Sequence, residues 1–318
     1  MELKFPLMRY DIVQPLLDGR VTVEGVTLKP FKTSSMVFTD VPQLRTGDFD
    51  LWELNWGYFL PALEAGWKFI GLPVFPKRKP AYQYIFCRTG AGIQSPKDLE
   101  GKRVATGQYR IVVDIWIRGL LKHQHGVDPS KLKWLSLRDD IFPIHDDKVQ
   151  IEIAKDDKNP VDRLVDGEVD AIITDISDVK LFHALENSPK VKRLFPDYVE
   201  RDQQVFRETG IYAPMHLIVM SEALDRKYPD LAGKIYAAFE QAKKVAYDDI
   251  LSDMAGFTLV NLRERMQEQM NTWGDPFKYG MRANKETIDR FNQYNIEQGL
   301  VRSVLPLEKQ FAASTLET

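Results

Sequence analysis

Residues 101–121 read GKRVATGQYRIVVDIWIRGLL. The pattern predicts a short strand at Val104–Thr106, a glycine turn and a helix through Asp114–Lys122. Lys133–Leu137 then predicts a second strand, so the whole segment is typical of a β-α-β unit. Free N–H groups at the start of such a helix can hold a carboxylate. This stretch therefore predicts an α/β fold in which residues near Tyr109 form one wall of a ligand site.

Strand-like and helical segments alternate on both sides of this unit, as expected of an α/β protein. Apolar runs predict strands at Leu3–Met8, Val23–Pro30, Phe49–Trp52, Trp67–Phe75, Tyr82–Arg88, Val169–Thr174 and Met215–Met220. Helical spacing and helix-ending glycines predict helices at Ser34–Arg45, Leu54–Ala65, Val161–Asp166, Leu231–Ala246 and Lys285–Gln298.

Two changes in this pattern predict that the chain crosses twice between two lobes. A flexible joint at Thr89–Gly92 ends the first run of strands. The segment Thr209–Pro214 precedes a strand that returns to the first lobe. We therefore expect a discontinuous lobe I of residues 1–88 and 212–318, and a lobe II of residues 89–211. Such a fold is expected to place a ligand cleft between its lobes, at the carboxyl ends of strands.

The composition argues against several classes of function. The 318 residues are 44% hydrophobic and 28% charged, with a net charge of −3 and a pI of about 6.0. Lys and Arg are scattered among acidic residues, so the sequence has no basic stripe for nucleic acid. No window approaches the roughly 20 apolar residues of a membrane helix, and the first residues lack a secretory leader pattern. Cys87 is the single cysteine, which excludes an internal disulfide. We therefore expect a cytoplasmic protein without nucleic acid or membrane partners.

Several groups of residues, spread in order along nearly the whole chain, are similar to one known family. They are Asp18–Val21 with Glu24–Leu28, Phe49–Leu54, Pro73–Arg78, Gly101–Val104 with Tyr109 and Trp116–Gly119, Arg207–Ile211 with Met215–His216, and Tyr279–Gly280 with Asn284 and Glu297–Leu300. Together they resemble the 4,5-dihydroxyphthalate decarboxylase family. The resemblance implies a two-lobed, type II periplasmic-binding-protein-like fold with a mixed sheet flanked by helices in each lobe. It also implies non-oxidative decarboxylation of an aromatic acid.

The sequence departs from the family pattern in ways that remove charge. Ile12 stands where the family has the arginine of a Tyr-Asp-Arg-Thr run after its first strand. Ala81 and Tyr82 stand where the family has arginine and histidine after its Val-Phe-Pro motif. Gln108 and Val112 replace an acid and a hydroxyl. The resemblance therefore implies a substrate with less negative charge than a dihydroxylated phthalate.

A decarboxylase needs a group that delivers a proton to the carbon that loses the carboxylate. His216 is the first candidate, because it lies in a matched motif at the expected return crossing and histidine titrates in the useful pH range. A structural histidine at a hinge is the alternative. Glu53 is the second candidate, because a carboxyl group isolated after a buried strand has a raised pKa and can donate a proton. For Glu53 the alternative is an internal salt bridge or a carboxylate at a helix start.

Other residues are candidates for binding a flat, acidic substrate. Arg78 at a strand end could hold a carboxylate with two parallel hydrogen bonds, with a surface arginine as the alternative. Aromatic rings after strands could stack on the ligand, although such rings are more often part of a core. Arg118 follows Asp114 by four residues, a spacing that predicts an ion pair within the helix. The complete substrate-binding set is Arg78, Asn55, Trp56, Tyr58, Tyr82, Gln108, Tyr109, Asp175 and Thr209.

The resemblance implies chemistry that needs no organic cofactor, and Gly90–Gly92 lacks the rest of a dinucleotide motif. A divalent metal held by Glu53, Asp175 and His216 stays open. The sequence thus predicts a carboxy-lyase of aromatic compound catabolism, whose partner is a small aromatic or carboxylate ligand. The alternatives are a solute-binding protein without catalysis and another lyase on the same fold. Whether the chain forms a homo-oligomer also stays open.

Overall fold

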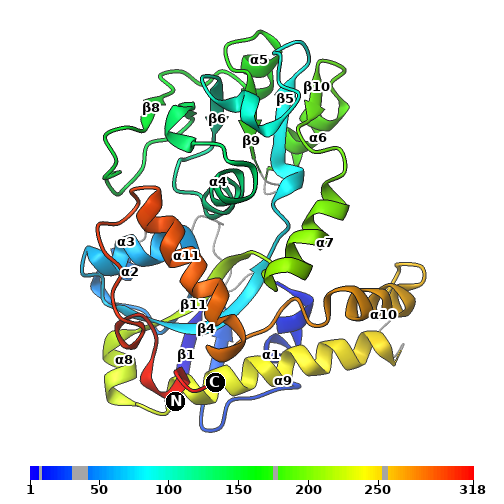
Figure 1. The fold of residues 1–318 in the computed structure, drawn as a ribbon. Helices are drawn as coiled ribbons and strands as arrows, with labels where there is room; N and C mark the ends of the chain where they lie inside the picture. Colours follow the sequence, from blue (N-terminus) through cyan, green and yellow to red (C-terminus); the bar gives the residue numbers. More distant parts are fainter. Residues whose placement is uncertain (7–8, 31–41, 175–177, 253–256) are drawn as a thin grey trace. The chain divides into compact units, whose positions relative to one another are not determined.

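The chain folds into two compact units (Figure 1). This computed structural model describes residues 1–6, 9–30, 42–174, 178–252 and 257–318. Unit 1 comprises Met1–Arg78, Phe206–Asp289 and Ser303–Thr318, and unit 2 comprises Lys79–Val205 and Arg290–Arg302. Within the described ranges, no helix has the length and apolar character needed to cross a membrane.

Unit 1 contains a two-stranded and a three-stranded sheet. β1 (Glu2–Phe5) pairs in parallel with β2 (Thr27–Pro30). β11 (Pro214–Ser221) lies between β3 (Leu51–Asn55) and β4 (Phe69–Arg78) and runs antiparallel to both. The Lys4 N–H donates to the Asp50 carboxylate over 2.7 Å, which links the two sheets. The helical elements of this unit are α1 (Gln14–Leu17), α2 (Pro42–Thr46), α3 (Phe59–Glu64), α8 (Glu222–Lys227), α9 (Leu231–Leu251), α10 (Leu262–Trp273) and α12 (Leu307–Gln310), with short 3-10 turns η1 (Asp11–Val13), η2 (Trp56–Tyr58), η6 (Arg282–Asn284) and η7 (Ala313–Thr315).

The core of unit 1 lies between these strands and the long helix α9. The apolar residues of α9, among them Ile235 and Phe239, recur at helical spacing on one face. That face packs against strand residues such as Phe5 and Ile218. The rings of Phe5 and Phe239 meet edge-on, with their centroids 6.0 Å apart. The strands that carry the candidate catalytic residues are therefore held by the main core of the unit.

Unit 2 is built on one six-stranded mixed sheet in the order β10-β5-β9-β6-β7-β8. Strands β6 (Arg103–Thr106), β7 (Lys133–Ser136), β8 (Gln150–Ile153) and β9 (Ala171–Ile173) pair in parallel. Strand β5 (Ile85–Arg88) pairs antiparallel with β9 on one side and with β10 (Val191–Arg193) on the other. The helical elements are α4 (Val112–His125), α5 (Pro160–Val165), α6 (Val179–Asn187), η3 (Tyr82–Tyr84), η4 (Pro96–Leu99) and η5 (Pro129–Lys131). Two further helices, α7 (Tyr198–Thr209) and α11 (Lys285–Glu297), each contain residues of both units.

Helix α4 is held in unit 2 by the second half of α11. The Trp116 ring lies 5.2 Å from the Phe291 ring and 5.7 Å from the Tyr294 ring. Gly119 permits this approach, because a Cβ atom at residue 119 would lie 2.0 Å from the Tyr294 ring. The helix stops at Gly126, whose φ of 63° is in the left-handed region that suits glycine. The second half of α11, which is distant in sequence, therefore fixes the position of α4, the helix that follows β6.

The expected fold class is confirmed, since both units combine helices with strands and the sheet of unit 2 is mixed. The β-α-β unit predicted from the opening stretch is confirmed as β6, α4 and β7, because β6 and β7 pair in parallel. The boundary expected near residue 88 falls elsewhere, because β5 pairs with β9 and β10 and so belongs to unit 2. Arg290–Arg302 also belongs to unit 2, although we expected it in lobe I.

Two local expectations need correction or fall partly outside the structure. The helix expected from Leu54 starts later, because Leu54 pairs with Leu217 and β3 continues to Asn55. Of the helix expected at Ser34–Arg45, the structure describes only the part that overlaps α2. Residues 7 and 8 of the first expected strand also lie outside the described residues.

Candidate functional site

Glu53 and His216, the two predicted catalytic residues, lie together on neighbouring strands of unit 1. Glu53 opposes Ile218 across β3 and β11, so His216 is its diagonal neighbour two residues along the strand. His216 Nδ1 lies 2.5 Å from Glu53 Oε1. Glu53 is 0% exposed and His216 is 5% exposed. The structure thus sets a buried carboxylate against one ring nitrogen of the candidate acid.

Tyr10 adds a third member to this pair. Its phenol O–H donates to the same Glu53 Oε1 atom, over 2.5 Å. Burial, the nearby Glu53 charge and this hydrogen bond raise the pKa of Tyr10 well above that of a free phenol, so Tyr10 keeps its proton at neutral pH. We refer to Tyr10, Glu53 and His216 as the proton-transfer triad.

The hydrogen bonds within the triad fix where the protons lie when Glu53 is ionised. A carboxylate can only accept, so Tyr10 Oη and His216 Nδ1 both carry a proton toward it. His216 Nε2 is then the ring nitrogen that gains or loses a proton. A carboxylate orients the catalytic histidine of hydrolase triads in the same way. The arrangement is therefore suited to delivering a proton from Nε2 to a bound molecule.

Sequence reasoning missed Tyr10 and Lys77. Tyr10 comes directly before η1, and the retained Tyr10–Asp11 part of the family run was the available signal. Lys77 of β4 is the cross-strand neighbour of His216. It lies in a matched motif, in which the sequence had favoured Arg78. The strand register, which no local pattern reveals, is what brings Lys77 beside the triad.

Arg78 serves as a clamp inside unit 1. Its Nη atoms donate to the Tyr212 carbonyl over 2.8 Å, the Lys278 carbonyl over 2.6 Å and Asn284 Oδ1 over 2.5 Å. Its Nε atom is buried without a hydrogen-bond partner in the described part of the chain. Burial lowers the pKa of Arg78 to about 10. Binding of a substrate carboxylate by Arg78 stays a prediction, and it would compete with these internal bonds.

The aromatic residues after β3 are packed inside unit 1. The Asn55 side chain accepts from the Gly57 N–H over 3.0 Å and so caps η2. Trp56 is 1% exposed and its ring lies 5.0 Å from that of Phe75, while Tyr58 is 2% exposed. Their role as substrate walls stays a prediction.

The remaining predicted substrate ligands have internal partners too. Thr209 Oγ1 accepts from the Ile211 N–H at the end of α7, over 3.1 Å. In unit 2, Tyr82 Oη shares a hydrogen bond of 3.0 Å with His125 Nε2, and Gln108 Nε2 donates to the Asp139 carbonyl over 2.5 Å. Tyr109 is buried with its ring against Arg118. Asp175 lies outside the described residues. Contact of these residues with a substrate stays a prediction.

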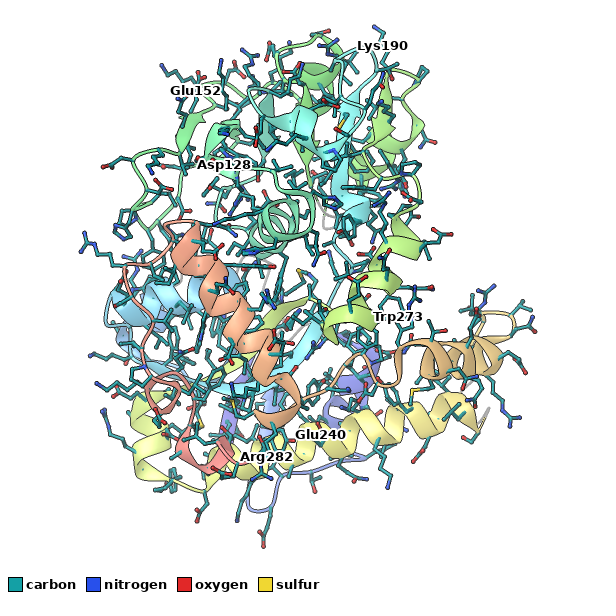
Figure 2. The ribbon with its side chains drawn as sticks, in the orientation of Figure 1. Asp128, Glu152, Lys190, Glu240, Trp273 and Arg282 are labelled. Carbon is teal, nitrogen blue, oxygen red and sulfur yellow. The ribbon has the colours of Figure 1, made fainter. Side chains whose placement is uncertain are left out.

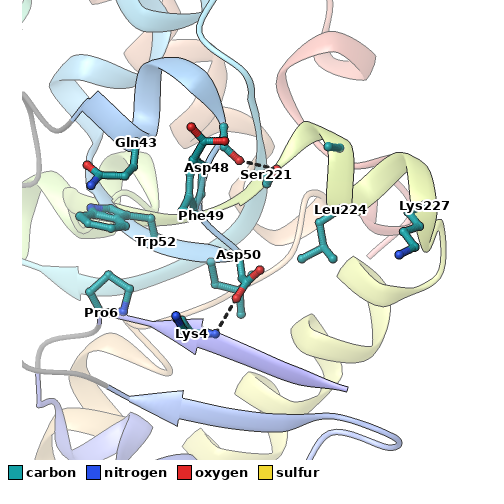
Figure 3. A pocket seen from close by; sticks show the side chains of 13 residues that line it. Lys4, Pro6, Gln43, Asp48, Phe49, Asp50, Trp52, Ser221, Leu224 and Lys227 are labelled. Carbon is teal, nitrogen blue, oxygen red and sulfur yellow. Dashed lines mark hydrogen bonds between the residues drawn. The ribbon is translucent and has the colours of Figure 1, made fainter.

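A cavity of about 650 Å³ lies beside the start of β3 in unit 1 (Figure 3). Trp52 and Phe49 line it together with the charged residues Lys4 and Asp50, but Glu53 and His216 do not. Tyr10 does not line it either, so no member of the triad is among its lining residues.

Metal ligands do not gather in the part of the chain that the structure describes. No group of three or more His, Cys, Asp or Glu side chains there could hold a metal ion. Glu53 Oε1 and His216 Nδ1 are bonded to each other, and Asp175 lies outside the described residues. The arrangement of Glu53 and His216 is that of a hydrogen-bonded acid and base.

Comparison with known proteins gives relatives for the chain. It is 27% identical over 332 aligned residues to a 4,5-dihydroxyphthalate decarboxylase of Comamonas testosteroni, with 100% of this chain and 98% of that protein covered. It is 28% identical over 183 residues to a protein of the same name from Pseudomonas putida, covering 54% of this chain and 70% of that one.

Solved structures and a family model extend these comparisons. The periplasmic aliphatic sulphonate binding protein SsuA from Escherichia coli has a TM-score of 0.57 at 14% identity, with 99% of this chain and 98% of that chain covered. This likeness confirms the periplasmic-binding-protein fold. A family model described as NMT1/THI5 like matches residues 79–250, which is more than half of the chain. The chain therefore belongs to the NMT1/THI5-like family, as a divergent relative of the 4,5-dihydroxyphthalate decarboxylases.

Proposed function

We propose that the protein is a carboxy-lyase that removes carbon dioxide from an aromatic acid, with His216 as the proton donor. The observation that carries the proposal is the bond between His216 Nδ1 and Glu53 Oε1, in a chain similar over its full length to a decarboxylase. The proposed substrates are hydroxylated benzoates or phthalates, because a ring hydroxyl supplies electron density to the carbon that takes up the proton.

In the proposed reaction, His216 Nε2 gives its proton to the ring carbon that bears the carboxylate. The new C–H bond uses an electron pair of the aromatic ring, so the ring is temporarily non-aromatic and electron-poor. A ring hydroxyl stabilises this intermediate by donating electron density. The C–C bond to the carboxylate then breaks, its electron pair restores the aromatic ring, and neutral carbon dioxide leaves. A proton from solvent returns to Nε2. The proposed route uses no organic cofactor.

Each member of the triad has a separate task in this scheme. Glu53 stabilises the imidazolium form of His216 before the proton leaves. Tyr10 holds the Glu53 carboxylate in place through its own O–H group. Lys77 is proposed to hold the substrate carboxylate, because it is the cross-strand neighbour of His216.

Carbon dioxide release from a panel of hydroxylated benzoates and phthalates tests the proposal. His216→Asn removes the titrating ring and should lower the rate by at least about 100-fold, the usual contribution of a positioned acid. His183→Asn is the matched control, because His183 is an exposed residue of α6. If His216→Asn keeps its activity, Glu53 becomes the better candidate acid. Absence of turnover across the panel, combined with saturable binding, would contradict a lyase.

A second candidate function is binding of a small molecule without catalysis. The fold shared with a sulphonate binding protein favours it, since the likeness spans 99% of this chain. In that case members of the panel bind to the wild-type protein, and none of them releases carbon dioxide. His216→Asn would then change affinity only. The same assay therefore separates the two functions.

A further inference from the structure

Arg118 of α4 is a buried cation that donates, within the described residues of unit 2, to two uncharged oxygen atoms. Its side chain is 0% exposed. Nε donates to Gln298 Oε1 over 2.7 Å, and Nη2 donates to the Tyr109 carbonyl over 2.7 Å. Asp114, which the sequence predicted as its ion-pair partner, accepts from Thr106 Oγ1, and its charge acts on Arg118 from a distance together with that of Asp140. Buried charges in proteins are normally paired with an opposite charge.

Two buried polar atoms at this place have no hydrogen-bond partner among the residues that the structure describes. They are Arg118 Nη1 and Tyr109 Oη. The two side chains are stacked, with the guanidinium carbon 3.8 Å from the centre of the Tyr109 ring. An unsatisfied buried donor costs about 1–3 kcal/mol. Two such donors on stacked side chains indicate an acceptor that the described part of the chain does not supply.

Both residues line a cavity of about 430 Å³ whose lining comes from unit 2 alone. Gly119, Val127 and Val149 contribute apolar surface to the same lining. The volume is within the range of sites for small organic ligands, roughly 300–1,000 Å³. Space for a ligand and donors without partners therefore occur together.

The carboxylates of the cavity are already engaged. Glu297 Oε2 accepts from Lys122 over 2.9 Å and from His123 over 2.8 Å. Asp128, labelled in Figure 2, accepts from both the N–H and the O–H of Ser130, over 3.0 and 2.7 Å. Asp146 also lines the cavity, and its Oδ1 accepts from a backbone N–H over 2.9 Å. These carboxylates therefore accept no hydrogen bond from Arg118 Nη1 or Tyr109 Oη.

We propose that this cavity binds a small oxyanion through Arg118 Nη1 and Tyr109 Oη. A guanidinium group prefers carboxylate and phosphate oxygens, and a phenol O–H adds a second donor. Burial lowers the pKa of Arg118, a cost that a bound anion offsets. The inference goes beyond the proposed function, because it involves no member of the triad and no proton transfer, and it gives Tyr109, which the sequence predicted as a substrate ligand, an anion-binding role in unit 2.

Calorimetric titration at constant ionic strength tests the site, with benzoate and inorganic phosphate as probes and chloride as the reference anion. Saturable binding of one or both probes is expected, and their relative affinities tell an organic carboxylate from an inorganic oxyanion. Tyr109→Phe keeps the ring on the guanidinium and removes only the O–H, so affinity should fall about tenfold. Arg118→Met should abolish saturable phosphate binding, and should also remove whatever part of the benzoate binding Tyr109→Phe weakens. Tyr228→Phe, at a more exposed tyrosine, is the control that should leave affinity unchanged.

The position of the anion supplies a second measurement. Crystals of the wild-type protein soaked in selenate should show anomalous scattering within hydrogen-bond distance of Arg118 Nη1. An ordered water bonded to Arg118 Nη1 and Tyr109 Oη, in place of selenate, would overturn the proposal. Binding that Tyr109→Phe leaves unaltered would overturn it as well. If Arg118→Met does not fold, the Tyr109→Phe affinity and the selenate position decide the question.

Discussion

One oxygen atom of Glu53 accepts hydrogen bonds from both Tyr10 Oη and His216 Nδ1. Because the two donors share this atom, a change in one bond alters the strength of the other. Removal of the phenol O–H leaves the Glu53 carboxylate with one hydrogen-bond donor fewer. Its negative charge then stabilises the protonated form of the His216 imidazole more strongly. Within the proposed function, Tyr10 is therefore a positioning residue that acts through Glu53.

Tyr10→Phe should move the basic limb of the pH–rate profile for carbon dioxide release to higher pH, by about one pH unit. The reason is that an acid must be protonated to act, and a more basic Glu53 delays loss of the His216 proton. The measurement is kcat/KM as a function of pH for the wild type, Tyr10→Phe and Tyr228→Phe. An unmoved limb with a lower rate would assign Tyr10 a purely structural role.

At the residue scale, the sequence could predict His216 and Glu53 but not their contact. Histidine in a matched motif and an acid beside a buried strand are visible in a linear pattern. Their contact depends on the register of β3 against β11, which joins residues separated by 163 positions. The same register decides that Lys77, and not Arg78, is the neighbour of His216.

At the scale of elements, the packing of α4 on α11 depends on the absence of a side chain at residue 119. A Cβ atom there would lie 2.0 Å from the Tyr294 ring. Gly119→Ala should therefore lower the free energy of unfolding by about 1–3 kcal/mol, although alanine favours a helix more than glycine does. Adding Tyr294→Leu should recover part of the loss, which urea unfolding of the two single variants and the double variant would measure. Simple additivity in this cycle would contradict a direct clash.

Asp202 of helix α7 holds the backbone at the start of η3 through hydrogen bonds. Asp202 Oδ1 accepts from the N–H groups of Ala81 and Tyr82, over 3.1 and 3.3 Å. Burial raises the pKa of Asp202 to about 6, although the two hydrogen bonds oppose the shift. The folded pKa is above the unfolded value of about 4. The contribution of the protonated Asp202 carboxyl group to the free energy of unfolding is therefore complete below pH 4 and is lost as pH rises through about 6.

Asp202→Asn keeps an acceptor for both N–H groups and removes the buried charge. It should raise the free energy of unfolding at pH 7 by about 1–2 kcal/mol and have little effect near pH 4. Urea unfolding at the two pH values measures the difference, with the exposed Asp157→Asn as control. Equal effects of Asp202→Asn at both pH values would contradict the role of ionisation.

The elements that the sequence predicted are those with strong apolar patterns, such as β4, β11 and α9. The missed strands β8 (QIEI) and β10 (VKR) are short edge strands with exposed, polar residues. Helix α10 was also missed, because Met266 is its single buried residue. A hydrophobic sequence pattern predicts an element well only when that element buries much apolar surface. Strands β8 and β10 and helix α10 bury little, so their formation depends on tertiary contacts that the pattern does not show.

At the scale of the whole molecule, strand pairing decides where the chain divides into its two units, and local glycine-rich segments do not. The glycine-rich joint at Thr89–Gly92 predicted a crossing near residue 88. The observed division at Arg78–Lys79 places β5 in the sheet of unit 2, where it lies between β9 and β10. No property of residues 79–88 in isolation shows which sheet they will join. Assignment of a linking strand to one unit or the other is a long-range property.

Both units contain buried or partly buried phenols whose pKa values are raised chiefly by desolvation. They are Tyr10, Tyr247 and Tyr279 in unit 1, and Tyr109 and Tyr294 in unit 2. The pKa of Tyr294 rises to about 12. Because the folded pKa values are higher than the unfolded value of about 10, the unfolded chain releases protons first as pH rises. The contribution of these groups is therefore complete below about pH 10 and is lost above it.

The free energy of unfolding should accordingly fall above about pH 10, by up to about 1.4 kcal/mol per pH unit for each such phenol. Tyr294→Phe keeps the ring beside Gly119 and should reduce the slope for unit 2, and Tyr247→Phe should do the same for unit 1. Urea unfolding between pH 9 and pH 11, followed by phenolate absorbance, measures both slopes. If the two units unfold in separate transitions, each variant should affect only the transition of its own unit. A slope that neither variant changes would mean that other groups cause the alkaline loss of stability.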